Sequence, residues 1–444
     1  MANLRDLPKV DTLSRSPALS AFPEAVRTQA ARAAVRMLRE AAMNGSKIDL
    51  AAAEELAEQE ANRLAGPSVR RVINASGVIL HTGVGRARLA KAVAKRLFEI
   101  ASSHAAVEID LESGRRGDRQ DHVRGLLTEL TGAEDAFVVN NCAAAVFLTL
   151  TALCAGREVI LSRGQMVEIG GSFRMPDIVR QSGCVLVEIG CTNKTRLSDY
   201  EEALTENTAA LLRCHPSNYR IFGFTETPSL AEMRKLADAK GVLLIEDLGS
   251  GCLFDTIPFG IPKEPTLQEA VADGADVVTA SGDKMLGGPQ AGLILGKSGS
   301  IQAIRKHPLA RAVRIDKLTL GALEATLKLH ATGRQCEIPI VRYLSRDAKE
   351  LRRIANSWKR AFPGDAVVEA GLSEVGGGSV PGVGLPTYRT GLAAPNPEEL
   401  AARLRSGEPP ILSRIEKDRV WLDPRTVEPD EAREVARILR SLIA

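Results

Sequence analysis

Two short stretches decide how this chain folds: Val242-Leu243-Leu244-Ile245-Glu246-Asp247 and Thr279-Ala280-Ser281-Gly282-Asp283-Lys284. The first stretch contains the apolar run Val242–Ile245, and the second continues from the run Val277–Thr279; both runs are typical of a buried β-strand. Each stretch ends in ionisable side chains. In open α/β sheets, ligands bind at the carboxyl ends of the strands. The two stretches therefore predict consecutive strands whose ends present Asp247 and Lys284 to one site.

Similar apolar runs recur on both sides of these stretches. The strand candidates are Ala136–Val139, Glu158–Leu161, Val185–Ile189, Ala209–Cys214, Val242–Ile245, Val277–Thr279 and Gly292–Leu295. Amphipathic segments alternate with them, and runs that are apolar on both sides indicate strands buried under helices. The pattern predicts an α/β fold with a mostly parallel central sheet.

We expect three domains, because 444 residues are too many for one compact core. Residues 1–66 predict a helical N-terminal domain with helices over Ser20–Glu40 and Asp49–Leu64, ended by Gly66-Pro67. Residues 67–330 predict the large α/β domain.

Residues 331–444 predict a small α+β domain at the C-terminus. It contains a helix near Arg346–Ala361, the glycine-rich stretch Gly376-Gly377-Gly378-Ser379 and a final helix near Glu431–Ile443.

The composition is that of an ordinary globular protein, with 44% hydrophobic and 25% charged residues and a net charge of +3. No apolar run approaches a membrane span, and the N-terminus has no signal-peptide pattern. The seven cysteines are scattered without a CxxC pair. This argues against disulfides and a metal site and predicts a cytoplasmic protein.

The pairing of Lys284 with Asp247 favours pyridoxal 5′-phosphate (PLP) as cofactor. A lysine at a strand end can bind PLP as a Schiff base, and a buried carboxylate can keep the pyridine nitrogen protonated, which makes the ring an electron sink. Taken singly, a surface lysine or a helix-capping aspartate would give the same residues. Together they favour the cofactor.

Further polar residues follow neighbouring strands and could complete a PLP site. Ser281 can reach the cofactor phosphate, and the helix start at Asn141-Cys142-Ala143 offers free N–H groups to it. His215 could stack on the ring or move protons, although a lone histidine is as often structural. This layout is similar to that of fold-type-I PLP enzymes, in which an asparagine at about the place of Asn218 touches the ring hydroxyl.

Arginines gather where a second anion could bind, because their planar forks suit phosphate-like groups. The candidates are Arg86, Arg119, Arg311 and Arg314. On the first helical segment, Arg32, Arg36 and Arg39 share one helix stripe. For each arginine taken alone, a solvated basic face is the simpler interpretation.

Long strings of the sequence resemble bacterial selenocysteine synthases, the L-seryl-tRNA(Sec) selenium transferases. The strings are Ile73–Thr82, Val167–Gly171, Thr192–Leu197, His215–Arg220, Glu246–Gly251, Ser281–Lys284 and Gly287–Gly292, and the match begins near Lys9. Cys142 stands where the family usually has asparagine, and Gln165 replaces a usual glutamate.

The resemblance implies conversion of L-seryl-tRNA(Sec) to L-selenocysteinyl-tRNA(Sec) by dehydration to aminoacrylyl-tRNA and addition of selenium from selenophosphate. Lys284 would carry PLP, Asp247 would bind the ring nitrogen, and Arg86, Arg311 and Arg314 would hold the donor. The N-terminal domain would hold the tRNA, and the chain would assemble as a ring of dimers, commonly a decamer.

Two other functions stay open. One is a PLP-dependent lyase that acts on a free amino acid or amino sugar; the N-terminal residues 1–66 argue against it, since lyases similar to this family lack such a domain. The other is an RNA-binding or regulatory protein without catalysis, which the presence of both Lys284 and Asp247 disfavours.

Overall fold

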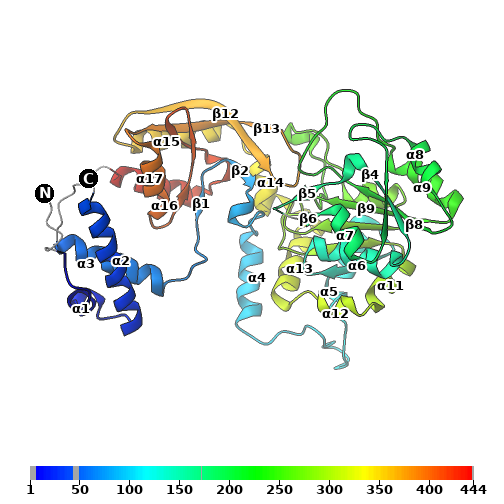
Figure 1. The fold of residues 1–444 in the computed structure, drawn as a ribbon, viewed down its shortest axis with the longest axis horizontal. Helices are drawn as coiled ribbons and strands as arrows, with labels where there is room; N and C mark the ends of the chain where they lie inside the picture. The colour runs from blue at the N-terminus through cyan, green and yellow to red at the C-terminus, as the bar shows by residue number, and fades with distance from the viewer. Residues whose placement is uncertain (1–6, 44–49, 172, 443–444) are drawn as a thin grey trace. The chain divides into compact units, whose positions relative to one another are not determined.

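The computed structural model describes residues 7–43, 50–171 and 173–442. The chain divides into two compact units, Met1–Val72 and Ile73–Ala444, which are described separately below (Figure 1). The predicted domain boundaries after residues 66 and 330 stay predictions.

The first unit is helical. Its elements are α1 (Val10–Ser14), the short 3₁₀ turn Pro17–Leu19, α2 (Glu24–Met43) and α3 (Leu50–Ala65). The two predicted helices are confirmed, although the predicted start at Asp49 lies outside the described residues. Alanines such as Ala30, Ala34 and Ala57 fill the interface of α2 with α3, and their small side chains let two short helices pack closely.

The second unit is built around a seven-stranded sheet with the order β3-β11-β10-β9-β8-β4-β7. Its strands are β3 (Asp135–Val139), β4 (Glu158–Ser162), β7 (Val185–Ile189), β8 (Thr208–Cys214), β9 (Leu243–Gly249), β10 (Val277–Ser281) and β11 (Gly292–Gly296). All seven predicted strands are therefore confirmed. The neighbours pair in parallel except at β11, which runs antiparallel to both β10 and β3.

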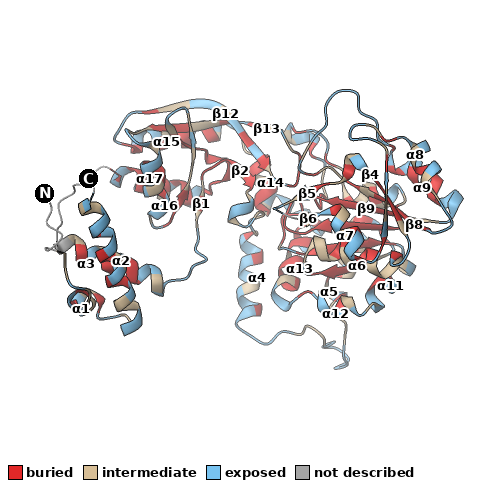
Figure 2. Cartoon of the chain, viewed as in Figure 1, coloured by how far each residue is buried: buried red, intermediate tan, exposed pale blue. Residues whose placement is uncertain are grey.

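Helices cover both faces of this sheet, as Figure 1 shows, and the strands between them are buried (Figure 2). One core cluster packs α5 (Asp121–Thr131), α9 (Leu230–Lys240) and α13 (Lys317–Ala331) on the sheet. The opposite cluster packs α6 (Cys142–Cys154), α7 (Met175–Gln181) and α11 (Ser298–Lys306). This burial on both faces explains the continuous apolar runs in the sequence.

A second sheet has the order β15-β16-β13-β12-β2. It combines β12 (Ala366–Gly376), β13 (Gly384–Ala393), β15 (Arg414–Glu416) and β16 (Arg419–Leu422) with β2 (Val78–Leu80). The predicted helices are present as α15 (Ala348–Ala361) and α17 (Pro429–Ser441). Because β2 pairs in parallel with β12, the chain near residue 80 lies beside Gly376. This pairing brings the glycine-rich stretch toward the large sheet.

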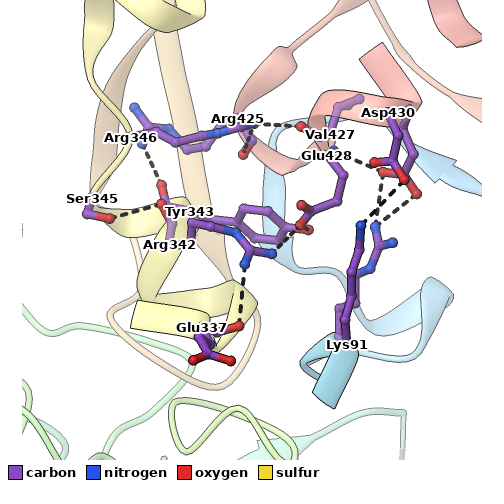
Figure 3. Close-up of polar contacts among 12 residues, drawn as sticks. Lys91, Glu337, Arg342, Tyr343, Ser345, Arg346, Arg425, Val427, Glu428 and Asp430 are labelled. Atoms are coloured by element: carbon purple, nitrogen blue, oxygen red, sulfur yellow. Dashed lines mark hydrogen bonds and ion pairs between the residues drawn. The ribbon is translucent and has the colours of Figure 1, made fainter. Parts of the chain in front are cut away.

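A polar cluster anchors the start of α17 (Figure 3). Glu428 accepts hydrogen bonds from Arg342 Nη2 at 2.6 Å and from the Tyr343 hydroxyl at 2.8 Å, both on α14 (Pro339–Leu344). Lys91, at the start of α4 (Lys91–Ala101), lies 3.6 Å from Asp430. These contacts tie α17 to helices packed beside the large sheet.

No helix within the described ranges has the length and apolar character to cross a membrane. Among the same residues, no group of three or more His, Cys, Asp or Glu side chains is arranged to hold a metal ion.

Candidate active site

A pocket of about 260 Å³ lies at the carboxyl ends of the central strands. Its lining includes eight residues predicted from the sequence, namely Arg86, Asn141, Cys142, Ala143, His215, Asp247, Ser281 and Lys284. Segments that are far apart in the sequence thus meet in one cavity, as expected for ligand sites in open α/β sheets.

Asp247 sits in a row of side chains that crosses three strands. In the strand register it pairs with Cys214 on β8 and with Thr279 on β10. Its Oδ1 accepts a hydrogen bond from Thr279 Oγ1 at 2.8 Å and a weaker one from Cys142 Sγ at 3.7 Å. Burial raises the pKa of Asp247, while the Thr279 hydrogen bond and the positive charge of Lys284 oppose that rise.

Lys284 follows the end of β10 and is buried, with 5% of its surface exposed. Two glycines lie close to its amine: a Cβ on Gly249 would come 3.8 Å from Nζ, and a Cβ on Gly378 would come 2.8 Å from Nζ. The turn that presents the lysine is fixed by the Met285 N–H, which donates to the Ser250 carbonyl at 2.9 Å. Loops from both sheets therefore enclose the amine.

The start of α6 forms another wall of the pocket. Asn141 caps this helix, since its Oδ1 accepts a hydrogen bond from the Ala144 N–H at 2.9 Å. The first N–H groups of a helix have no partner within the helix, and its dipole favours an anion there. Cys142 and Ala143 line the cavity, so the start of α6 faces it.

His215 follows β8 and lines the pocket beside Asp247. Its backbone N–H donates to the backbone carbonyl of Asp247 at 2.9 Å. The Nε2 atom of its ring lies 3.3 Å from Oε1 of the buried Glu264. Glu264 comes from the loop between β9 and α10 (Leu267–Ala272). Sequence reasoning missed it, because nothing in the loop pattern marks a contact back to residue 215.

Arg86 reaches the pocket from the segment after β2. Its Nη1 lies 3.0 Å from Asp283 Oδ2, and the Ser281 hydroxyl donates to Oδ1 of the same carboxylate at 2.6 Å. The backbone of Arg86 has a positive φ of 58°, which is uncommon for a residue other than glycine. An arginine, a carboxylate and a hydroxyl thus meet directly beside Lys284.

Four predicted site residues do not line this pocket. Asn218 is exposed and donates to the Glu168 carbonyl at 2.8 Å. Arg119 and Arg314 both contact Glu108, with Arg119 Nε at 2.8 Å and Arg314 Nη1 at 3.5 Å. Arg311 is exposed on the short helix α12 (Leu309–Ala312).

The pocket also has walls that sequence reasoning did not assign. The hairpin of β5 (Glu168–Ile169) and β6 (Phe173–Arg174) contributes apolar surface from Ile169 and Phe173. Ser217, Gly249 and Gln290 also line the pocket. The strings that carry the family resemblance contain Ile169, Ser217, Gly249 and Gln290. Phe173 lies outside those strings, and no sequence signal marked it.

Comparison with known proteins agrees with this geometry. A family profile described as "L-seryl-tRNA selenium transferase" matches residues 72–428. The chain belongs to that family. A relative from Solidesulfovibrio magneticus, named L-seryl-tRNA(Sec) selenium transferase, is 47% identical and covers 99% of this chain and 98% of its own length. One from Aquifex aeolicus with the same name is 44% identical, with 95% of each chain covered.

The fold is that of the fold-type-I PLP enzymes, as predicted. The solved structure of D-glucosaminate-6-phosphate ammonia-lyase superposes with a TM-score of 0.60 at 24% identity, over 85% of this chain and 96% of that one. At that identity the likeness shows the fold alone. In this member of the L-seryl-tRNA selenium transferase family, the strings that carried the resemblance include the strand ends at Asp247 and Lys284.

Proposed function

We propose that this protein is a PLP-dependent L-seryl-tRNA(Sec) selenium transferase, which converts L-seryl-tRNA(Sec) to L-selenocysteinyl-tRNA(Sec) with selenophosphate as selenium donor. The observation that carries the proposal is the meeting of Lys284 and Asp247 in one buried pocket, in a chain that belongs to this family along nearly its whole length.

The residues of the pocket fit PLP. Asp247 Oδ1 already has two donors within the protein, and its other oxygen is left for a protonated ring nitrogen. The helix start at Asn141, Cys142 and Ala143 suits the phosphate, and Ser281 lines the same cavity. Gly378 fits as well, because any Cβ there would meet the lysine amine. Lys284 is the amine that would bind the cofactor covalently.

When bound, PLP supplies an electron sink for the carbon next to the substrate amine. Lys284 would hold the cofactor, and its Nζ would be the base that takes the α-proton of the seryl group. The β-hydroxyl would leave as water, and the selenium of selenophosphate would bond to the β-carbon while a proton returns to the α-carbon. Water would then cleave the P–Se bond and release inorganic phosphate. Hydroxide is a poor leaving group, so a proton must reach the hydroxyl oxygen. His215 lines the pocket and contacts Glu264, and we assign it this proton transfer.

The donor site that we propose begins at Arg86, the predicted donor-binding arginine that lines the pocket. Arg314 lies near the pocket edge: it forms a backbone bridge with Val139, two residues before Asn141. We propose that Arg311 and Arg314, with Arg119 beside them, bind the phosphate portion of selenophosphate. Arg314 would then exchange its 3.5 Å contact with Glu108 for the donor.

For the tRNA, we propose the N-terminal unit as the binding surface. Arg32, Arg36 and Arg39 are all exposed along α2, as an RNA-backbone contact requires. We further propose that the protein acts in the cytoplasm, where its charged tRNA substrate is made, and assembles as a ring of dimers, commonly a decamer.

The test is to give the PLP-loaded protein seryl-tRNA(Sec) or free L-serine, each with selenophosphate, and to follow the cofactor absorbance and the aminoacyl product. We expect a spectral change and selenocysteinyl-tRNA(Sec) with the charged tRNA only, and neither with Lys284→Ala. Turnover of a free amino acid without any reaction of the charged tRNA would instead favour the lyase.

A further inference from the structure

The two oxygens of the Asp247 carboxylate have different surroundings. Oδ1 takes both described donors, Thr279 Oγ1 at 2.8 Å and Cys142 Sγ at 3.7 Å. Among the described residues, no hydrogen bond to Oδ2 is present, while Asp247 lines the pocket. We propose that Thr279 and Cys142 are positioning residues that hold Asp247 by Oδ1 and leave Oδ2 to face the ring nitrogen of PLP. This inference rests on the proposed cofactor.

The two donors come from different elements, a strand and a helix, and together they hold the orientation of the Asp247 carboxylate. Thr279 is the in-register neighbour of Asp247 on β10, where it is 1% exposed. Cys142 begins α6, the helix that also offers its N-terminus to the pocket. A carboxylate held from both a strand and a helix cannot rotate without breaking one of the two hydrogen bonds.

The chemistry of both donors suits this role. A threonine hydroxyl can donate, and here its acceptor is Asp247 Oδ1. Burial raises the pKa of the Cys142 thiol well above its ordinary value, and the charge of Asp247 raises it further. Cys142 therefore keeps its proton and acts as a weak S–H donor rather than as a nucleophile.

The electrostatics explain why such donors are needed. Burial raises the pKa of Asp247, which favours the neutral acid, and a neutral acid cannot form an ion pair with a protonated ring. The Thr279 hydrogen bond, the charge of Lys284 and the Cys142 hydrogen bond all lower that pKa. Thr279 and Cys142 differ from Lys284 in being neutral donors that contact Asp247 Oδ1 directly.

The experiment compares PLP binding by apoprotein variants that remove or keep each donor. We expect Thr279→Val to weaken PLP binding about tenfold, because a hydrogen bond to a charged group is worth roughly that much or more. Thr279→Ser should bind as the wild type does. Cys142→Ala should weaken binding less, by about threefold, since a thiol donates weakly, and Cys142→Ser should restore it.

A double-mutant cycle separates positioning of Asp247 from a general loss of packing. In an Asp247→Asn background, Thr279→Val should have little further effect on PLP binding. The pH dependence of the bound cofactor's absorbance should shift in Thr279→Val and not in Thr279→Ser. Thr149→Val is the matched control, because the Thr149 hydroxyl is buried in α6 and has no hydrogen-bond partner among the described residues; it should change neither quantity.

The outcomes distinguish this inference from the proposed function. Wild-type protein that binds no PLP would overturn the cofactor proposal itself. Wild-type binding that is unaltered in Thr279→Val and Cys142→Ala, or equal losses with and without Asp247, would overturn only the positioning role.

Discussion

Gly378 lies so close to Lys284 that a Cβ on residue 378 would come 2.8 Å from both Cε and Nζ of the lysine. Gly378 has a φ of +95° and belongs to the loop between β12 and β13, in the second sheet. Real Cβ atoms do not approach other atoms this closely. The backbone of the C-terminal sheet thus forms part of the wall around the amine that we assign to the cofactor.

The first prediction concerns this close approach. Gly378→Ala should displace the lysine amine and lower the transferase rate about a hundredfold, the loss that a misplacement of roughly 1 Å can cause. Steady-state turnover and PLP absorbance measure it. Gly382→Ala is the matched control, because Gly382 also has a positive φ, +70°, but no atom of the described residues lies within 4 Å of its added Cβ. Equal losses in both variants would show that backbone strain, not the clash with Lys284, is responsible.

The second prediction concerns Glu264. Glu264→Gln should lower the rate of β-hydroxyl loss about tenfold, because His215 loses the carboxylate that lies 3.3 Å from its Nε2. A positioned acid or base contributes about 10²- to 10⁴-fold, and the loss of its partner should remove only a part of that. Single-turnover kinetics measure the step, and PLP affinity should not change. Glu202→Gln, at an exposed site, serves as the control. A full rate in Glu264→Gln would remove Glu264 from the proton transfer.

The third prediction concerns pH and Glu246. Burial raises the pKa of Glu246 from 4.5 to about 7, against the lowering effect of the Arg213 guanidinium. Between those values the folded protein holds a proton that the unfolded chain releases, so this group stabilises the fold below about pH 4.5 and its contribution is lost as the pH rises through about 7.

Glu246→Gln mimics the protonated acid and should remove this dependence. The difference in thermal midpoint, wild type minus Glu246→Gln, should therefore decrease as the pH is raised from 5 to 8. The corresponding difference in the free energy of unfolding should change by no more than about 1.4 kcal/mol per pH unit. Parallel midpoints over this range would contradict the assignment.

The fourth prediction concerns RNA. Replacing Arg32, Arg36 and Arg39 by alanine should weaken tRNA binding and flatten its salt dependence, by about 0.7–0.9 in the log–log slope for each phosphate that is no longer neutralised. Filter binding at several salt concentrations measures both. The control replaces the exposed Arg353, Lys359 and Arg360 of α15. If the two triple variants lost affinity equally, net charge alone would account for the effect.

The central sheet could be predicted because its strands are buried on both faces and leave continuous apolar runs, as in β8 (Thr208–Cys214). The second sheet could not be predicted in the same way. Residues of β12 and β13 are partly exposed, and β13 contains Pro386 and Gly391. The partner of β12, β2, lies far earlier in the chain, since Glu374 pairs with Val78.

The residues of the candidate site likewise fall into those that local sequence predicts and those that it does not. The meeting of Lys284 and Asp247 in one pocket could be predicted, because each follows or ends an apolar strand segment that is recognisable from local sequence. Gly378 and Glu264 could not, because their contacts depend on the paths of long loops. Asn218 shows the limit at short range: three residues beyond His215, the chain has already turned, and the Asn218 side chain donates to the Glu168 carbonyl.

The most direct test of the central claim, that Lys284 carries PLP, is borohydride reduction of the PLP-loaded protein followed by peptide mass spectrometry. Borohydride fixes an imine between PLP and a lysine as a stable amine. We predict the reduced cofactor on Lys284, and none on any residue of Lys284→Ala. A modified lysine elsewhere in the wild type, or none at all, would contradict the account.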